Sequence, residues 1–215
     1  MTIFVAMKKL FCIIGALLWS VMALAQSPEE ILNRMSDVWE EHEKDGVIMT
    51  VDTKIPVLGT MTMKNYSLGN KTRTEGKMLG VQVIIWDDGV TEWTYTEKTN
   101  KLEIKNSPVD TSSDGGDSEL FNDVTDGYDI SLKKETDDAW LLLCKKSKTN
   151  TDKDAPKTVE IMVAKNTYYP ISLKTKMSGV SLVLRDISFD VKEEFVTFRM
   201  EDYPGVKVED ARKKQ

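Results

Sequence analysis

Apolar residues recur every three or four positions between Pro28 and Lys44. This spacing places them on one face of a helix. Ser27 suits the N-cap, Pro28 suits the first turn, and Gly46 ends the pattern. We therefore predict an amphipathic helix with an apolar stripe made of Ile31, Leu32, Met35, Val38 and Trp39.

After Gly46 the pattern changes to short segments in which apolar and polar residues alternate, separated by turn residues such as Asp88-Gly89. A period of two is typical of strands with one buried face, and the short turns indicate antiparallel pairing. We find no repeat and no domain boundary, which predicts one mainly β (α+β) domain over residues 26–215. The predicted strands are Val47–Lys54, Gly59–Asn65, Asn70–Glu75, Val81–Trp86, Glu92–Glu97, Lys101–Lys105, Tyr128–Lys133, Ala139–Lys145, Thr158–Ala164, Pro170–Met177, Val180–Asp190 and Glu194–Arg199.

A polar stretch from Ser107 to Asp117 interrupts the strands in the middle of the chain. It leads into Ser118–Val124, where a short helix is predicted to begin on Ser118. About a dozen strands in one sheet must curl or close. We therefore expect a strongly curved sheet with the first helix over its concave side, and a middle segment that runs over the surface.

The first 25 residues have the pattern of an export signal. Lys8-Lys9 precedes an apolar run from Leu10 to Met22, and Ala23-Leu24-Ala25 offers a cleavage point. The run is short for a membrane span and leads at once into an acidic stretch, which argues against a permanent anchor. Cys12 lies inside the run, so it cannot become the lipid-modified first residue of a lipoprotein. We expect cleavage before Gln26 and a free protein in the periplasm.

Charge and cysteine content narrow the partners of the mature chain. Cleavage removes two of the 29 basic residues and none of the 35 acidic ones, so 27 minus 35 gives a net charge of −8. This balance argues against nucleic acid or an anionic membrane surface as the main partner, since both need clustered positive charge. Cys144 is then the only cysteine, so no internal disulfide forms and the fold depends on burial alone.

The sequence lacks the residue sets of common catalytic and metal sites. A Ser-His-Asp triad needs a histidine, and the only one, His42, lies at the edge of the helical stripe, where a structural role is favoured. One histidine and one mature cysteine provide no zinc site. Asp114, Asp117, Asp123 and Asp126 could bind a hard cation weakly, but solvated loop carboxylates are the better interpretation. We predict no enzyme activity, no cofactor and no metal, although the sequence is uninformative about paired carboxylates, whose spacing is set in space.

Two segments resemble a known family. The segment from Asp88 to Tyr95, Asp-Gly-Val-Thr-Glu-Trp-Thr-Tyr, resembles the Asp-Gly-Lys-Thr-x-Trp-x-Tyr hairpin of LolA-type outer-membrane lipoprotein carriers. The segment from Pro204 to Arg212, Pro-Gly-Val-Lys-Val-Glu-Asp-Ala-Arg, resembles their closing Gly-Val-x-Val-Asp-Asp-x-Arg segment. The order of elements is also similar over nearly the whole mature chain.

The resemblance implies an incomplete antiparallel β-barrel of about a dozen strands with a helical lid. It implies a carrier without catalysis, which accepts lipoprotein acyl chains from an inner-membrane ABC lipoprotein-releasing complex and delivers them to an outer-membrane acceptor. Two positions depart from the family pattern. Asn65 stands where the family has an arginine thought to latch the lid, and Pro204 directly precedes Gly205. These departures imply a different latch and easier exchange of ligand.

Strand alternation predicts the side chains that line the concave face, because alternate residues of a strand share a face. A change of parity between Leu184 and Ile187 requires a bulge near Arg185. For each residue the alternative is an ordinary place in the core; the methionines favour binding, since they are flexible and polarizable. The predicted acyl-chain cavity consists of Met49, Val51, Met61, Met63, Trp93, Tyr95, Leu102, Ile104, Leu141, Leu143, Leu182 and Leu184. The predicted lid residues are Ile31, Met35, Val38 and Trp39.

Three functional hypotheses follow from these features. The first is a monomeric periplasmic carrier that shuttles lipoproteins from the inner to the outer membrane. The second is a lipid-sensing regulatory module of the same fold, which binds a signalling protein instead of an ABC transporter. The third, an enzyme acting on a lipid or glycan, is the least favoured because the residues of common mechanisms are missing.

Overall fold

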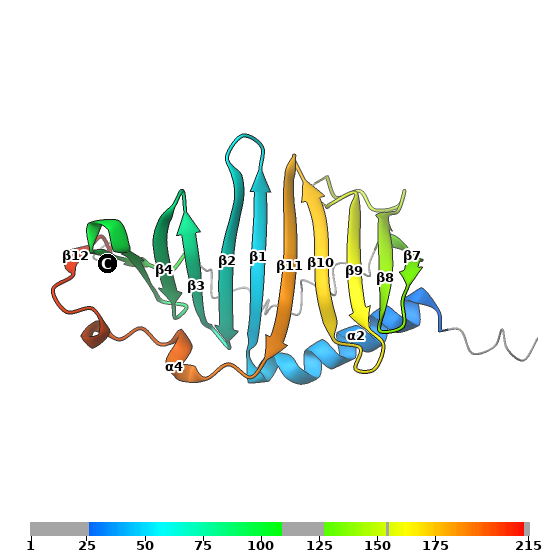
Figure 1. Ribbon diagram of the computed structural model, residues 1–215, viewed down its shortest axis with the longest axis horizontal. Coiled ribbons are helices and arrows are strands. Elements are labelled where there is room, and N and C mark those ends of the chain that lie inside the picture. Colours follow the sequence, from blue (N-terminus) through cyan, green and yellow to red (C-terminus); the bar gives the residue numbers. More distant parts are fainter. Residues whose placement is uncertain (1–25, 109–126, 154, 213–215) are drawn as a thin grey trace, which may run out of the picture.

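A single open sheet of twelve strands dominates the described part of the protein (Figure 1). The computed structural model describes residues 26–108, 127–153 and 155–212. The predicted signal peptide at residues 1–25 and the predicted helix at Ser118–Val124 lie outside the described residues. The two outermost strands do not pair with each other, so the sheet is not closed into a barrel.

The N-terminal helix α2 spans Pro28–His42 and continues as a 3-10 turn over Glu43–Asp45. The Ser27 side chain accepts a hydrogen bond from the backbone N–H of Glu30 at 3.1 Å, which is the bond of an N-cap. Gly46 follows with a φ of 82°, and a Cβ atom there would lie 2.7 Å from a backbone oxygen. Glycine is therefore needed for both conformation and space. The predicted helix and both of its end signals are confirmed.

The strands lie across the sheet in the order β12-β6-β5-β4-β3-β2-β1-β11-β10-β9-β8-β7. Every neighbouring pair is antiparallel except β12, which pairs with β6 in parallel. A 3-10 turn at Glu97–Thr99 joins β5 to β6. The strand bounds are β1 Val47–Ile55, β2 Gly59–Leu68, β3 Lys71–Met78, β4 Val81–Asp87, β5 Thr91–Thr96, β6 Lys101–Asn106, β7 Tyr128–Glu135, β8 Ala139–Lys146, β9 Thr158–Ala164, β10 Pro170–Met177, β11 Val180–Phe189 and β12 Lys207–Asp210.

The C-terminal part differs from the prediction. The predicted strand Glu194–Arg199 is wrong, because the short helix α4 occupies Glu193–Val196 and a 3-10 turn follows at Met200–Asp202. The twelfth strand is instead β12, where the sequence pattern predicts none. Short apolar runs do not distinguish a helix from a strand by periodicity. Tertiary packing favours the helix in this segment. The ring of Phe195 in α4 stacks on the ring of Tyr66 in β2, with centroids 5.9 Å apart.

β11 contains the bulge predicted near Arg185. The register between β1 and β11 shifts at this point, and Asp186 has a positive φ of 53°. The extra residue restores the parity of the strand. Leu184 and Ile187 therefore pack against the same core, as expected.

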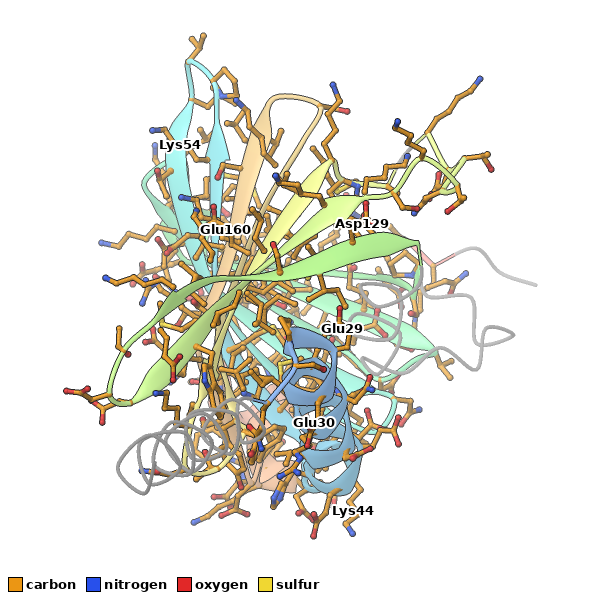
Figure 2. All side chains as sticks on the ribbon, turned by 90° about the vertical axis from the view of Figure 1, so that its right-hand side faces the viewer. Glu29, Glu30, Lys44, Lys54, Asp129 and Glu160 are labelled. Atoms are coloured by element: carbon orange, nitrogen blue, oxygen red, sulfur yellow. The ribbon has the colours of Figure 1, made fainter. Side chains whose placement is uncertain are left out.

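The two faces of the sheet have different covers. The helix α2 packs on one of them, which we call the helix face, and runs along the lower part of β8 to β11 in Figure 1. On the opposite face α4 contacts β2 and β3, where Val191 and Val196 pack on the buried side chain of Tyr66. Figure 2 shows the strands fanned out behind β7, the strong twist expected of a large sheet.

Candidate functional site

Beneath α2 the helix face is a closed core. Ile31, Met35 and Trp39 of α2 are at most 1% exposed and pack against side chains of β1 and β8 to β11. The Trp39 ring meets the Phe189 ring edge to face, with centroids 5.6 Å apart. Three of the four predicted lid residues thus lie in this core, and Val38 is half-buried.

A row of helix-face residues continues from this core across the sheet. Its members on β8, β9, β10, β11, β1, β2, β3 and β4 are Leu142, Ile161, Leu173, Leu184, Val51, Met63, Gly76 and Val83. The four residues nearest α2, on β8 to β11, are almost completely buried. Val51 and Met63 are only half-buried. The apolar surface therefore extends beyond the part that is packed under α2.

We call the helix-face side chains of β2 and β4 in this region the β2–β4 patch; it consists of Met61, Met63, Val81, Val83 and Ile85. Val83 is buried, whereas the other four are half-buried. Between the two strands lies Gly76, where a Cβ atom would come within 2.7 Å of the sulfur of Met63. The methionine side chain therefore lies over a glycine of β3, with room to change its conformation.

Six of the twelve predicted cavity residues lie on the helix face. Met49, Val51, Leu182 and Leu184 belong to the core under α2 or pack against it. Met61 and Met63 belong to the β2–β4 patch, and Met61 lies in register with Thr53 and, through it, with Leu182. The structure therefore brings these six into one continuous surface.

The other six predicted cavity residues lie on the opposite face, so grouping all twelve on one face is wrong. On β5 the partners of the helix-face residues Val83 and Ile85 are Thr96 and Thr94, which leaves Trp93 and Tyr95 pointing the other way. The opposite-face residues are Trp93, Tyr95, Leu102, Ile104, Leu141 and Leu143. Alternation within one strand shows which residues share a face, but not which face is inward. The pairing register from β1 to β5 determines which face of β5 lies on the side of α2.

Aromatic rings from the C-terminal segment cover Trp93 and Tyr95. The Phe198 ring stacks on that of Trp93 at 5.1 Å, and the Tyr203 ring lies 4.7 Å from that of Tyr95. Burial raises the pKa of the Tyr203 hydroxyl. Leu102, on the same face, is completely buried. The hairpin that carries the family resemblance thus contributes to a second core.

Val81, Val83 and Ile85 are site residues that the sequence prediction missed. In β4 apolar side chains occupy both faces, because Ile84 and Trp86 alternate with them. The available signal is the two-residue turn Leu79-Gly80, which fixes the register of β4 against β3. Read together with the helix-face methionines of β2, that register places the three residues beside Met63.

Polar groups border the patch. The Asn65 side chain donates a hydrogen bond from Nδ2 to Oγ1 of Thr74 at 3.0 Å, on the helix face of β2 and β3. This is the position where the family pattern has an arginine. Beyond β4 the helix face carries Glu92, Thr94 and Glu103. The apolar surface therefore ends at β5.

The histidine and the cysteine of the described residues both have structural surroundings. Cys144 is completely buried, and burial raises its thiol pKa to about 11. His42 Nε2 lies 2.9 Å from the hydroxyl of Tyr169, beside a pocket of about 450 Å³ that Phe189 and Asp190 also line. Within the described residues, no group of three or more His, Cys, Asp or Glu side chains is placed to hold a metal ion. Across residues 26–108, 127–153 and 155–212, no helix combines the length and apolar character that a membrane span needs.

Comparisons with known proteins identify the fold. No protein-family model matches the chain, and no curated protein matches it in sequence. Among solved structures, the lipoprotein LppX of Mycobacterium tuberculosis has a TM-score of 0.54 at 12% identity, over 77% of this chain and 96% of LppX.

Two further solved structures are similar at lower scores. LprF of Mycobacterium bovis has a TM-score of 0.49 at 7% identity, over 78% of this chain and 96% of LprF. A LolA superfamily protein of Nitrosomonas europaea has a TM-score of 0.32 at 14% identity, over 81% of this chain and 99% of that protein. Of these three structures, LppX is the one whose score shows that the chain shares its overall fold.

Proposed function

We propose that the protein is a non-enzymatic carrier of lipid or lipoprotein acyl chains in the cell envelope, and that the chains bind on the helix face. The observation that supports this role is the apolar row that runs from the buried core under α2 to the half-buried Met61 and Met63. Each methylene group moved from water onto such a surface contributes about 0.8 kcal/mol. The free energy of burying a long acyl chain along this row is therefore favourable.

In this proposal α2 is a displaceable cover. Its stripe of Ile31, Leu32 and Met35 already fills the apolar surface of β8 to β11. An acyl chain would first occupy the β2–β4 patch and then compete with α2 for the adjoining core. Because both occupants are apolar, exchange costs less than opening an empty cavity to water would. Release of the cargo is eased in the same way.

The location and partners form part of the same proposal. The export pattern of residues 1–25 would place the mature protein in the periplasm. The resemblance of the segments Asp88–Tyr95 and Pro204–Arg212 to LolA-type carriers supports the choice of partners. We infer that an inner-membrane ABC lipoprotein-releasing complex supplies the cargo and that an outer-membrane acceptor receives it.

Binding of a fluorescent long-chain fatty acid to the protein recovered from the periplasm tests the acyl-chain site. Met63→Gln, in the β2–β4 patch, is expected to weaken binding about tenfold, because an amide replaces apolar contact. Met162→Gln is the matched control, since Met162 is also half-buried but lies on the opposite face of β9. Equal affinities of the two variants would contradict the proposed site.

The carrier role is tested separately from the acyl-chain site. Inner-membrane vesicles with an active ABC lipoprotein-releasing complex are incubated with the purified protein, and soluble triacylated lipoprotein is measured. Transfer into a soluble complex is expected. A protein that binds the fatty acid, takes up no lipoprotein and co-purifies with a membrane-bound signalling protein would instead be the lipid-sensing regulator.

A further inference from the structure

Three hairpin tips at one edge of the sheet carry exposed apolar side chains. The tips join β1 to β2, β3 to β4 and β10 to β11, and they lie side by side along the upper edge in Figure 1. We call their large apolar residues the apolar rim, with exposed fractions of 104% for Val57, 61% for Leu58, 44% for Met78, 75% for Leu79 and 43% for Met177. The molecule thus presents a row of apolar side chains to solvent.

The conformation of these tips does not explain their apolar residues. Val57 has a φ of 72° and Leu79 a φ of 50°. A positive φ favours glycine, asparagine or aspartate, and it is unusual for a β-branched residue. Turn stability would therefore favour polar residues at both positions. Neither side chain contributes to a core, since both extend into solvent.

The charge around the apolar rim is positive, in contrast to the net charge of −6 for the whole chain. Lys54, Lys77 and Lys176 are exposed next to the three tips. Among the described residues, none of these lysines forms a salt bridge. No aspartate or glutamate occurs in residues 53–61, 76–82 or 174–181. The local charge is thus complementary to an anionic surface.

The turns at the other edge of the sheet have a different character. They contain Gly69-Asn70, Asp88-Gly89-Val90 and Asp137-Asp138. Of the residues in these turns, Val90 is the exposed large apolar one, with 71% of its surface accessible. The described turns at this edge therefore connect strands without a cluster of exposed large apolar residues, so joining two strands does not by itself account for the apolar rim.

We propose that the apolar rim docks the protein on an anionic lipid surface, with the tips among the headgroups and the three lysines facing the phosphates. Apolar side chains backed by basic ones are the arrangement that binds membrane interfaces. This inference rests on the proposed function and extends it. Met61 and Val81 of the β2–β4 patch follow two of the tips within three residues. Docking therefore brings the patch to the membrane, and an acyl chain passes between them without crossing water.

Flotation with lipid vesicles tests this inference. The periplasmic protein is mixed with vesicles of phosphatidylcholine, with or without one-third phosphatidylglycerol. It is expected to float with the anionic vesicles and to be released by high salt, which screens the lysines. The triple variant Leu58→Ser, Leu79→Asn and Met177→Ser is expected to reduce the bound fraction at least about tenfold, because it removes three apolar contacts. Val90→Asn, at the other edge, is the matched control and is expected to bind as the unmodified protein does.

A second variant separates charge from apolar contact. Lys54→Glu, Lys77→Glu and Lys176→Glu together are expected to remove the preference for anionic vesicles. Unchanged flotation of either triple variant, or no flotation of the unmodified protein, would overturn docking on lipid. Self-association through the rim, seen as a dimer that the apolar triple variant abolishes, would also overturn it.

Fatty-acid binding in solution distinguishes the docking surface from the acyl-chain site. The apolar triple variant is expected to retain the affinity of the unmodified protein for the fluorescent fatty acid, while Met63→Gln loses it. If the triple variant lost fatty-acid affinity, the rim would be part of the acyl-chain site and the docking role would be rejected. If Met63→Gln bound normally while the rim still floated, the proposed acyl-chain site would fail and docking would stand.

Discussion

Leu79 is an example of a residue whose local conformation and chemical type disagree. Several non-glycine residues of the protein have positive φ, and three of them, Asn100, Asp186 and Asp190, are of types that tolerate it. Leu79 is not, and its side chain is 75% exposed. A left-handed conformation costs an ordinary residue about 1–2 kcal/mol. The free energy of the isolated protein is therefore not minimised at this position.

Leu79→Asn should consequently stabilise the protein while it weakens lipid docking. We expect an increase of about 0.5–1 kcal/mol in the free energy of unfolding, since asparagine is favoured in this type of hairpin turn. Urea denaturation followed by tryptophan fluorescence measures it. The reciprocal change Asn100→Leu, at a φ of 46°, should decrease stability. A lower stability of Leu79→Asn would show that Leu79 supports the fold.

Cys144 should respond to pH through its burial. Burial raises the thiol pKa to about 11 from the ordinary value of 9.0. Between these values the unfolded thiol loses its proton while the folded one keeps it, so stability falls as the pH rises. The expected loss is on the order of 2 kcal/mol. Cys144→Ala, although less stable at neutral pH because of the cavity, should show a smaller loss between pH 9 and 11; an identical loss would contradict this origin.

At the scale of elements, the two faces of the sheet are closed by segments from the two ends of the described chain. The helix α2 covers the β7 to β11 side of the helix face, and α4 with the residues after it covers the opposite face of β2 to β5. These two covers have different consequences for function. Among the described elements, α2 is the cover that lies on the same face as the β2–β4 patch, so of the two covers α2 is the one in a position to compete with an acyl chain.

Phe198→Ala separates the roles of the two covers. Loss of the ring contacts with Trp86 and Trp93 should lower the free energy of unfolding by about 1–3 kcal/mol, because Phe198 is half-buried. Affinity for the fluorescent fatty acid should not change below the unfolding transition. Urea denaturation and fatty-acid titration on the same sample measure both quantities. A loss of affinity in the folded variant would place the acyl chain on the opposite face, next to Trp93 and Tyr95.

At the scale of the whole molecule, carrier function requires an apolar surface that is available without unfolding. The open sheet satisfies this requirement because its outermost strands, β12 and β7, remain unpaired with each other. The apolar row therefore spans the helix face without being closed into a barrel interior. With the apolar rim at one edge, the molecule would combine the proposed binding surface with the proposed route to it.

Ligand binding should accordingly stabilise the folded protein as a unit. At a free fatty-acid concentration of about 100 times the dissociation constant, the free energy of unfolding should rise by about 2.7 kcal/mol. Thermal unfolding followed by circular dichroism measures the shift, with Met162→Gln as a positive control. Met63→Gln at the same fatty-acid concentration should show a clearly smaller shift. A fatty acid that lowers the unfolding temperature would indicate preferential binding to the unfolded chain.

Features that depend on local periodicity can be predicted from the amino-acid pattern alone. The helix beginning after Ser27, the strands through β11 and the bulge near Arg185 all follow from spacing that neighbouring residues share. The same information assigned Met61 and Met63 to one face of β2. It also argued against a zinc site, since residues 26–215 contain one histidine and one cysteine.

The orientation of β5, β6 and β8 relative to α2, in contrast, depends on pairing across the sheet. Alternation within a strand shows which of its residues share a face. Which of the two faces lies on the side of α2 depends on the pairing register of every strand between that strand and the helix. The run Leu141–Leu143 is apolar on both faces, so its pattern contains no preference. The C-terminal segment likewise became helix and edge strand through contacts with β2 and β6, residues about 100 positions away. Long-range packing, not local spacing, therefore separates the proposed acyl-binding surface from the second core.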